Sequence, residues 1–416
     1  MNSMSTKSTK QIAVIGAGAA GMVAAGAALQ SGASVTVFEH KDRPLKKLRI
    51  TGKGRCNLTN DCTVPEFLNN VIANPRFLYT ALSHLSPEDT KALFEGLGVP
   101  LKTERGNRVF PLSDKAADIA EALMRYAKGA FLCYERVQGV LVEEGRVLGV
   151  LTSQKRLFDA VILATGGLSY PLTGSDGSGL AMARALGHTI VPPVPSLVPI
   201  TSSDGSCPAM QGLSLKNVGL RIVNKETRKV LYQDFGEMMF THFGLTGPMI
   251  LSASAHLRGM DLSALEALID MKPALDEKTL DRRLLSDFER FCNRNFSHAL
   301  SDLLPTKMIP VMIERVNIAP DKKVNLITKE ERKRLLDTIK AFPVSLAGFR
   351  PISEAIVTSG GVCTKEINPK TMASRLVEGL YFAGEMIDVD AYTGGFNLQI
   401  AFSTGHLAGT SAALAE

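Results

Sequence analysis

The order of apolar and polar positions along the chain predicts an α/β fold that starts with a strand, a helix and a second strand. Residues 12–15 form a short apolar run, and residues 34–39 combine alternation with β-branched side chains, as half-buried strands do. Between them lies an alanine-rich stretch after Gly21 that is typical of a helix. Residues 11–39 therefore predict a βαβ unit.

Helices and strands continue to alternate up to about residue 190. Helical spacing runs through 75–97, where Ser86 is predicted to begin a helix, and Ser113 is predicted to cap another helix over 114–128. Strand-like runs follow around 131–142, 146–151 and 156–164.

A cluster of prolines marks a domain boundary. Pro192, Pro193 and Pro195 cannot continue a helix or a central strand. The strand-rich stretch that follows is compatible with a small sheet or barrel, and helical spacing then takes over, with a capping box at Thr328 to Glu331. The predicted organisation is a first domain that begins with 1–190, a β-rich domain over 191–276 and a helical domain over 277–341. Residues 342–416 are then predicted to return to the β-rich domain and to the second part of the first domain.

Composition supports a folded chain of this size. The 416 residues are 45% hydrophobic and 21% charged, which is close to the globular average and suits two or three domains. Six cysteines without a Cys-x-x-Cys pair indicate neither a disulfide framework nor a zinc site. We therefore expect a cytoplasmic protein without a bound metal, and composition does not indicate its oligomeric state.

The net charge of +6 is concentrated in one place. Between Lys41 and Arg55 there are seven basic residues and one acidic residue. Such a cluster favours a phosphate-bearing ligand or a nucleic acid, although Lys46 and Lys47 also fit a solvated lysine face. The uncharged stretch 11–29 superficially resembles a signal peptide or a membrane span, but its glycine spacing fits a strand–turn–helix unit better, so no membrane partner is expected.

The glycine spacing after the first strand carries the strongest chemical signal. Gly16, Gly18 and Gly21 form G-x-G-x-x-G, in which the first glycine makes the turn, the second lets a pyrophosphate approach and the third permits close packing of helix and strand. Glu39 ends the next strand and is placed to bind ribose hydroxyls. Together they predict a Rossmann-like dinucleotide site.

This motif alone does not separate NAD from FAD. No second G-x-G-x-x-G follows a strand, so one dedicated dinucleotide site is expected. Further glycine-rich turns occur at 52–54, 166–167, 174–179, 360–361 and 394–395. An elongated ligand that contacts several strand ends explains these turns better than a compact nicotinamide cofactor does, although any one of them also fits an ordinary turn.

Four longer motifs carry a family resemblance, namely Thr51 to Asn60, Ala164 to Pro171, Phe240 to Pro248 and Gly379 to Gly405. They resemble the bacterial NAD(P)/FAD-dependent oxidoreductases of the bile-acid-inducible flavoprotein and aminoacetone oxidase type, along nearly the whole chain. The resemblance implies a discontinuous FAD domain with an inserted β-barrel and a helical domain. Lys53 departs from the pattern, because many relatives carry glycine there.

The resemblance also implies which residues meet the cofactor. The first loop, from Gly52 to Asn60, is expected to pass along the cofactor, with Gly54 giving backbone access, Arg55 pairing with a phosphate and Asn57 hydrogen-bonding the cofactor. Thr165, Gly166 and Gly167 resemble the second flavoprotein turn. Near the C-terminus, Asp388 or its competitor Glu385 is expected to bind ribityl hydroxyls, and Gly395 and Asn397 open a helix that would favour negative charge on the reduced flavin. Other residues predicted at this site are Ala19, Ala20, His40, Lys47, Thr59, Val137, Gly384, Phe396 and Leu398.

The substrate side has few signals. His242 is the best candidate for a proton donor or substrate contact, with Tyr392 as a weaker one, although either fits a structural role too. Cys56 is expected to be a packed, inert thiol. The predicted activity is hydride transfer through FAD, with NADH or NADPH as a transient donor and an activated C=C bond of a small molecule as acceptor. RNA modification, in the form of uridine reduction, and amine oxidation are the alternatives.

Overall fold

A five-stranded parallel sheet forms the centre of the part of the chain that carries the glycine motif. The computed structural model describes residues 9–415. In spatial order the strands of this sheet are β19 (Leu380–Phe382), β10 (Ala160–Leu163), β1 (Gln11–Ile15), β2 (Ser34–Phe38) and β6 (Phe131–Cys133). All of its strand pairs are parallel; β10 is an apolar run that is buried throughout, and β1 is buried after its first residue. The α/β, Rossmann-like fold class is confirmed.

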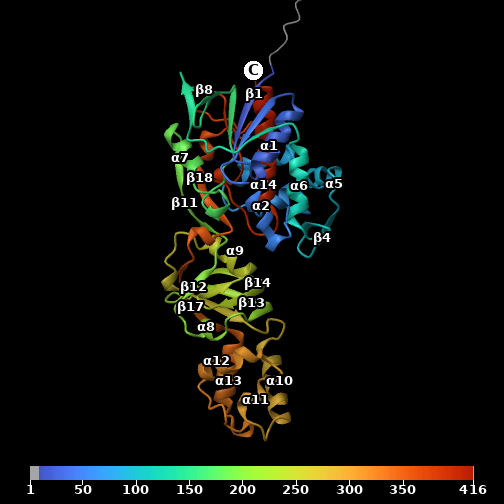
Figure 1. Cartoon of the computed structure of the whole chain (residues 1–416). Coiled ribbons are helices and arrows are strands. Elements are labelled where there is room, and N and C mark those ends of the chain that lie inside the picture. The colour runs from blue at the N-terminus through green and yellow to red at the C-terminus, as the bar shows by residue number, and fades with distance from the viewer. Residues whose placement is uncertain (1–8, 416) are drawn as a thin grey trace, which may run out of the picture. The chain divides into compact units, whose positions relative to one another are not determined.

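Helices from both ends of the chain pack together beside this sheet (Figure 1). A Cβ atom at Gly405 would lie 2.4 Å from the backbone oxygen of Ala20, and one at Gly409 would lie 2.2 Å from that of Ala24. Glycines at these two positions therefore let helix α14 approach helix α1 backbone to backbone. The helices of this part are α1 (Ala19–Gln30), α2 (Lys46–Ile50), α3 (Val64–Leu68), α4 (Tyr79–His84), α5 (Pro87–Gly96), α6 (Ala116–Tyr126), α7 (Ser178–Ala185) and α14 (Phe396–Leu414).

Helix starts follow the sequence in two places and differ in one. Thr328 forms the predicted capping box with Glu331, and Ser86, predicted to begin a helix, caps α5 and also forms a capping box, with Asp89. Ser113 does not cap a helix, because α6 begins only at Ala116. The intervening Asp114 has a left-handed backbone with φ of +58°, which ends any helical run before it starts.

Three smaller sheets complete this part of the chain. Their strands are β3 (Thr59–Asn60), β5 (Arg108–Pro111) and β4 (Leu101–Glu104) in the first, β7 (Gly139–Glu143), β8 (Arg146–Leu151) and β9 (Lys155–Leu157) in the second, and β11 (Ile190–Ser196) and β18 (Val357–Val362) in the third. The proline cluster lies inside β11, where the pairing register shifts between Val191 and Val194. The prolines are tolerated because β11 belongs to a two-stranded ribbon.

The chain divides into two compact units. Unit 1 comprises the residues up to Ser196 and from Ile352, and unit 2 is Leu197–Pro351. The division thus falls six residues after the expected boundary, because β11 pairs with β18 in unit 1. The helical segment 277–341, expected as a separate domain, shares one hydrophobic core with the β-rich segment in unit 2.

Unit 2 contains a closed barrel and helices. The barrel strands in spatial order are β12 (Ile200–Ser202), β15 (Gly244–Thr246), β14 (Val230–Thr241), β13 (Ser214–Asn224), β16 (Leu265–Asp270) and β17 (Phe342–Phe349). Its helices are α8 (Ser206–Ala209), α9 (Pro248–His256), α10 (Glu277–Arg290), α11 (Phe296–Ala299), α12 (Ile309–Val316) and α13 (Lys329–Lys340). The barrel closes only when β17 returns after the helices, so its strands are not contiguous in sequence.

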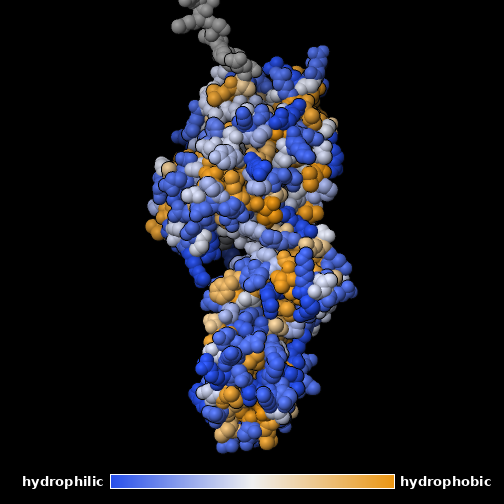
Figure 2. Space-filling model, turned by 180° about the vertical axis from the view of Figure 1, so that it is seen from behind, coloured by the Kyte–Doolittle hydropathy of each residue, from blue (hydrophilic) through white to orange (hydrophobic). Residues whose placement is uncertain are grey.

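The two units have separate hydrophobic cores. Figure 2 shows hydrophilic residues over most of the visible surface, with smaller hydrophobic patches between them. Within the described residues, no helix combines the length and the apolar character that a membrane span needs.

Candidate functional site

The glycine turn has the geometry that the motif predicts. Gly16 has φ of +102°, and its N–H donates to the Phe38 carbonyl at 2.9 Å. A Cβ atom at Gly21 would lie 1.9 Å from the Gly16 oxygen, so only glycine allows this contact between turn and helix. At Gly18, no heavy atom of the described residues other than its chain neighbours lies within 4 Å of an added Cβ. The backbone at the N-terminus of α1 is therefore open at the position where a pyrophosphate would approach.

Glu39 lies beside this turn at the end of β2. Its carboxylate accepts hydrogen bonds from the backbone N–H of Ala17 at 3.2 Å and of Lys41 at 2.8 Å. His40 is partly buried next to it, and burial together with the charge of Arg136 lowers the pKa of this imidazole. The acidic group predicted for the ribose is thus anchored to the glycine turn itself.

A second acidic group lies close to His40. Burial alone would raise the pKa of Asp176, but hydrogen bonds from Ser178 and Arg136 outweigh it and lower this pKa to about 2. Val137, another predicted contact residue, is buried and lines a cavity of about 460 Å³ between residues 136–140 and α7. Glu39 and Asp176 both lie close to His40, at 3.6 Å and 3.9 Å.

The turn after β10 lies against the turn after β1. Ala164 N–H donates to the Ile15 carbonyl at 2.9 Å, and Gly166 has φ of +74°. The hydroxyl of Thr165 is buried and has no hydrogen-bond partner among the described residues. Both turns follow the carboxyl ends of neighbouring parallel strands, which is where α/β folds bind dinucleotides, and an unpartnered buried hydroxyl fits a bound polar group there.

The loop from Thr51 to Asn60 is wound tightly in left-handed backbone conformations. Gly52, Lys53, Gly54 and Cys56 all have φ between +57° and +85°. Lys53, the departure from the family pattern, therefore adopts the conformation that glycine favours. Oriented so that its nitrogen faces carbonyl groups, the Asn57 amide accepts from the Gly395 N–H at 3.1 Å and so joins this loop to the start of α14.

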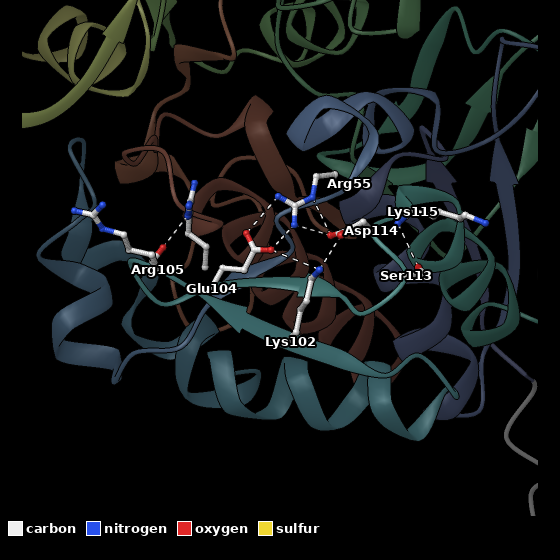
Figure 3. A network of polar contacts seen from close by, with 8 residues as sticks. Arg55, Lys102, Glu104, Arg105, Ser113, Asp114 and Lys115 are labelled. Atoms are coloured by element: carbon white, nitrogen blue, oxygen red, sulfur yellow. Dashed lines mark hydrogen bonds and ion pairs between the residues drawn. The ribbon is translucent and has the colours of Figure 1, made fainter. Parts of the chain in front are cut away.

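Arg55 is held by two carboxylates of the chain itself (Figure 3). Its guanidinium donates to both oxygens of Glu104, and its Nε donates to Asp114 at 2.8 Å. Lys102 also donates to Asp114, at 2.7 Å. The guanidinium further lies 4.2 Å from the centre of the Phe110 ring. Arg55, expected to pair with a phosphate, thus has Glu104 and Asp114 as its partners within the chain, and its phosphate contact stays a prediction.

Lys47 and Glu385 form a largely buried ion pair. Lys47 Nζ lies 2.5 Å from Glu385 Oε2 and 2.6 Å from Ser169 Oγ, and the other Glu385 oxygen accepts from Ser169 and from the Thr358 N–H, each at 2.8 Å. Burial alone would raise the pKa of Glu385, but the charge of Lys47 and these hydrogen bonds outweigh it and lower the pKa. Both residues were predicted to meet the cofactor directly, whereas here each has the other as its partner.

The start of α14 packs against the end of the loop from Thr51 to Asn60. A Cβ atom at Gly395 would lie 2.2 Å from the Thr59 oxygen, and Thr59 Oγ1 donates to Gln399 at 2.6 Å. Asn397 holds the preceding turn by accepting from Ala391 N–H at 3.0 Å and donating to the Ala391 oxygen at 2.7 Å. The helix begins without a side-chain cap, so its N-terminal N–H groups favour an anionic neighbour.

Other predicted residues near this end have structural partners. The side chain of Asp388 accepts from Asn74 at 3.0 Å. Phe396 is buried with its ring edge on Phe67, Leu398 is partly buried against the same core, and Gly384 N–H donates to Thr404 at 3.0 Å. Ala19 and Ala20 lie in the first turn of α1.

Cys56 and Cys62, the cysteines of the 51–62 segment, are free thiols whose pKa values are raised. Cys56 is buried, and burial raises the pKa of its thiol to about 12. Burial and neighbouring acidic groups raise the pKa of Cys62 to about 11. The burial of Cys56 agrees with the packed thiol that the sequence predicts, and its inertness stays a prediction.

The two residues predicted for catalysis belong to different units. His242 lies in unit 2 at the exposed turn between β14 and β15, and the centres of the His242 and Phe243 rings lie 5.0 Å apart in an edge-to-face arrangement. Tyr392 lies in unit 1, and its backbone N–H donates to Asn70. Their catalytic roles stay predictions.

Sequence reasoning missed the partners that hold the predicted residues. Glu104, Asp114 and Thr358 stand outside the motifs and carry no local signal, because their role depends on contacts between distant segments. Ser169 lies inside the motif Ala164 to Pro171 and was open to detection as a polar residue in an otherwise glycine-rich turn.

The family of the chain follows from these features and from one comparison. Residues 10–411 match the family described as HI0933-like protein Rossmann domain. The chain belongs to this family of bacterial flavoprotein oxidoreductases.

Named relatives extend along nearly the whole chain. The 3-dehydro-bile acid delta(4,6)-reductase of Clostridium scindens is 32% identical, over 97% of this chain and 99% of the relative. The ribosomal RNA dihydrouridine synthases of Haemophilus influenzae and Escherichia coli are 31% and 28% identical, over 94% of this chain and 96% and 95% of their own lengths.

Solved structures show the same fold at low identity. A 3-ketosteroid-delta4-(5alpha)-dehydrogenase from Rhodococcus jostii is similar with a TM-score of 0.54, 16% identity and coverage of 99% of both chains. A flavocytochrome c3 fumarate reductase gives a TM-score of 0.51 at 18% identity, over 98% of this chain and 78% of that one.

Proposed function

We propose that this flavoprotein is an NAD(P)H-linked reductase that adds a hydride to a C=C bond conjugated to a carbonyl group in a small molecule. Three features of unit 1 carry the proposal: the open glycine turn after β1, the turn after the neighbouring parallel strand β10 with its unpartnered buried hydroxyl, and the start of α14 without a side-chain cap. An elongated dinucleotide with a redox-active ring fits such a set of strand-end turns.

The residues divide into groups that would hold different parts of FAD. Gly16 and Gly18 at the start of α1 would hold the pyrophosphate, and Glu39 the ribose hydroxyls. The N-terminus of α14 would favour negative charge on the ring. Bound FAD supplies the hydride transfer, while this chain orients the ring and keeps its surroundings ordered.

The names of the relatives point to one reaction class. The Clostridium scindens relative is named as a delta(4,6)-reductase of a 3-dehydro-bile acid, and the other relatives are named for dihydrouridine formation. Dihydrouridine is uridine in which the ring double bond next to a carbonyl group has been saturated. Both names therefore describe reduction of a conjugated C=C bond, which supports the same chemistry for this chain.

Charge pairing favours a small molecule over RNA as the substrate. Lys46, Lys47 and Arg55 supply three of the seven cations between Lys41 and Arg55, and acidic side chains of the chain neutralise all three. A cation that is paired with a carboxylate of the chain contributes less to binding the phosphate backbone of RNA. The two RNA-modifying relatives make reduction of uridine in ribosomal RNA the second candidate.

Anaerobic reduction and a substrate panel test the proposal. We expect purified protein to release FAD, its visible absorbance to bleach with NADH or NADPH, and a steroid-like conjugated enone to restore the colour with formation of the saturated ketone. Unmodified ribosomal RNA, tested in parallel, should leave the flavin reduced. Protein that binds no flavin would overturn the proposal, and reoxidation by RNA but not by enones would favour the second candidate.

A further inference from the structure

The loop 51–56 adopts a conformation that its own residues disfavour. Lys53 and Cys56 are not glycines, yet they have φ of +59° each. Side chains in this region meet backbone atoms, so each such residue costs about 1 kcal/mol or more and persists only where the surroundings impose it. A tight turn of this kind inside a predicted cofactor loop needs an anchor.

Arg55 provides the strongest anchor of this loop. It makes a two-pronged contact with Glu104 on β4 and a further contact with Asp114, and it lies against Phe110 on β5. Figure 3 shows Lys102 joining the same two carboxylates from the far side. Isolated surface ion pairs contribute little, but a bidentate arginine in a network with a stacked aromatic ring fixes a single geometry.

The other side of the loop is fixed by the start of α14. Asn57 accepts from Gly395, and Asn60 Nδ2 donates to the Gly394 oxygen at 3.0 Å. The loop is thus held between the β4–β5 hairpin and the start of α14. A displacement of Arg55 would be passed to both ends of this loop.

We propose that Arg55 is a positioning residue, which sets the 51–56 turn toward the flavin ring through Glu104 and Asp114 and does not bind a phosphate of the cofactor. The inference rests on the proposed function, because it assumes that FAD binds at this site. The guanidinium has its charge matched by two carboxylates, and both respond to it. The Arg55 hydrogen bond lowers the pKa of Glu104, and Lys102 and then Arg55 lower the pKa of Asp114.

Binding of FAD and ADP to the apoprotein separates the two roles. ADP carries the adenosine and the pyrophosphate but lacks the flavin ring. A positioning role predicts that Arg55→Met and the double variant Glu104→Gln/Asp114→Asn both weaken FAD binding about tenfold, which corresponds to about 1.4 kcal/mol, and leave ADP binding unchanged. Combining all three substitutions should weaken FAD binding no further than either variant alone, because both variants disrupt the same ion-pair network. The midpoint potential of the FAD that still binds should shift in both variants, which a change in fold stability alone would not produce.

Two further variants complete the test. Arg55→Lys keeps the charge but not the two-pronged geometry, so it should behave like Arg55→Met, whereas a phosphate contact would be partly restored by lysine. Arg290→Met is the matched control in unit 2, because Arg290 pairs with Asp302 and lies 4.9 Å from the Phe291 ring. It should leave FAD binding and the potential unchanged.

The opposite pattern would overturn the proposal. If Arg55→Met weakens ADP and FAD alike while Glu104→Gln/Asp114→Asn tightens both, the carboxylates only compete with a phosphate for Arg55. If Arg55→Met does not fold, Arg55→Lys and the carboxylate variant decide between the roles by the same measurements. Wild-type protein that binds ADP but never FAD would instead refute the proposed function.

Discussion

The ion pair of Lys47 and Glu385 predicts a loss of stability that its neighbour Lys46 does not share. Lys47 is mostly buried with Glu385 and Ser169, whereas Lys46 pairs with Asp42, whose side chain is 73% exposed. Replacing Lys47 by methionine keeps the length and the apolar stem but leaves a carboxylate without its cation. Lys46→Met is the matched control from the adjacent position.

The expected magnitude follows from burial and from the remaining partners of Glu385. Removing one member of a fully buried pair costs about 3 to 5 kcal/mol. Here each side chain keeps about a fifth of its exposure, and Ser169 and Thr358 still donate to the carboxylate, so we expect about 2 to 3 kcal/mol. For Lys46→Met we expect about 0.5 kcal/mol or less.

The pH dependence gives a second, signed expectation. The pKa of Glu385 is lowered in the folded chain, so its contribution to stability is present above the ordinary carboxyl pKa and is lost as the pH falls through the folded value. Without Lys47 burial dominates and the pKa rises, so the carboxylate is destabilising at neutral pH and the penalty fades on acidification. The difference between wild type and Lys47→Met should therefore shrink between pH 7 and about pH 4.5.

The loss of stability in each variant can be measured locally by native-state hydrogen exchange with mass spectrometry. Peptides that contain residues 384–390 report on unit 1 alone, so unit 2 does not contribute. The double variant Lys47→Met/Glu385→Gln should recover part of the loss, because no charge is then left buried. Equal losses in Lys46→Met and Lys47→Met, or a Lys47→Met deficit that grows as the pH falls, would refute this reasoning.

Other predictions concern the glycine turn, the division of roles and the buried thiol. Gly18→Ala should leave the unfolding temperature unchanged and weaken FAD binding, whereas Gly21→Ala should cost about 1 to 3 kcal/mol of stability, because its Cβ would lie 1.9 Å from a backbone oxygen. Glu39→Ala should chiefly reduce FAD retention, and His242→Ala should leave retention intact and slow turnover; equal FAD loss in both would contradict these roles. Cys56 should stay unmodified by iodoacetamide at pH 8 in the folded chain, as read by peptide mass spectrometry, because its pKa is about 12.

Local chemistry explains why the glycine turn was predictable. Gly16, Gly21 and Glu39 lie within one βαβ unit, and their spacing alone determines which backbone atoms meet. The capping boxes at Ser86 and Thr328 were predictable for the same reason, since each involves residues three positions apart. What a short segment does with its own neighbours is visible in sequence.

Contacts between distant segments were not predictable. Lys46 and Lys47 are adjacent and chemically identical, and only the fold brings Glu385, 338 positions away, to one of them. Arg55 likewise has the motif context of a phosphate ligand, and its partners at 104 and 114 lie outside that motif. A charge in a motif therefore indicates that a partner exists without indicating which partner.

The glycines of α14 show that a contact between distant segments can sometimes be recognised in the sequence. Gly405 and Gly409 in the interior of a helix each cost about 1 kcal/mol relative to alanine, so local propensity argues against them. They are accommodated because the backbone oxygens of α1 occupy the space of their Cβ atoms. The helix that follows the first cofactor motif and the last helix of the chain are thus one packed pair. The proposed flavin site uses the N-terminus of α1 and the N-terminus of α14. Because these two helices pack on each other, both ends of the sequence have to fold together before the site is complete.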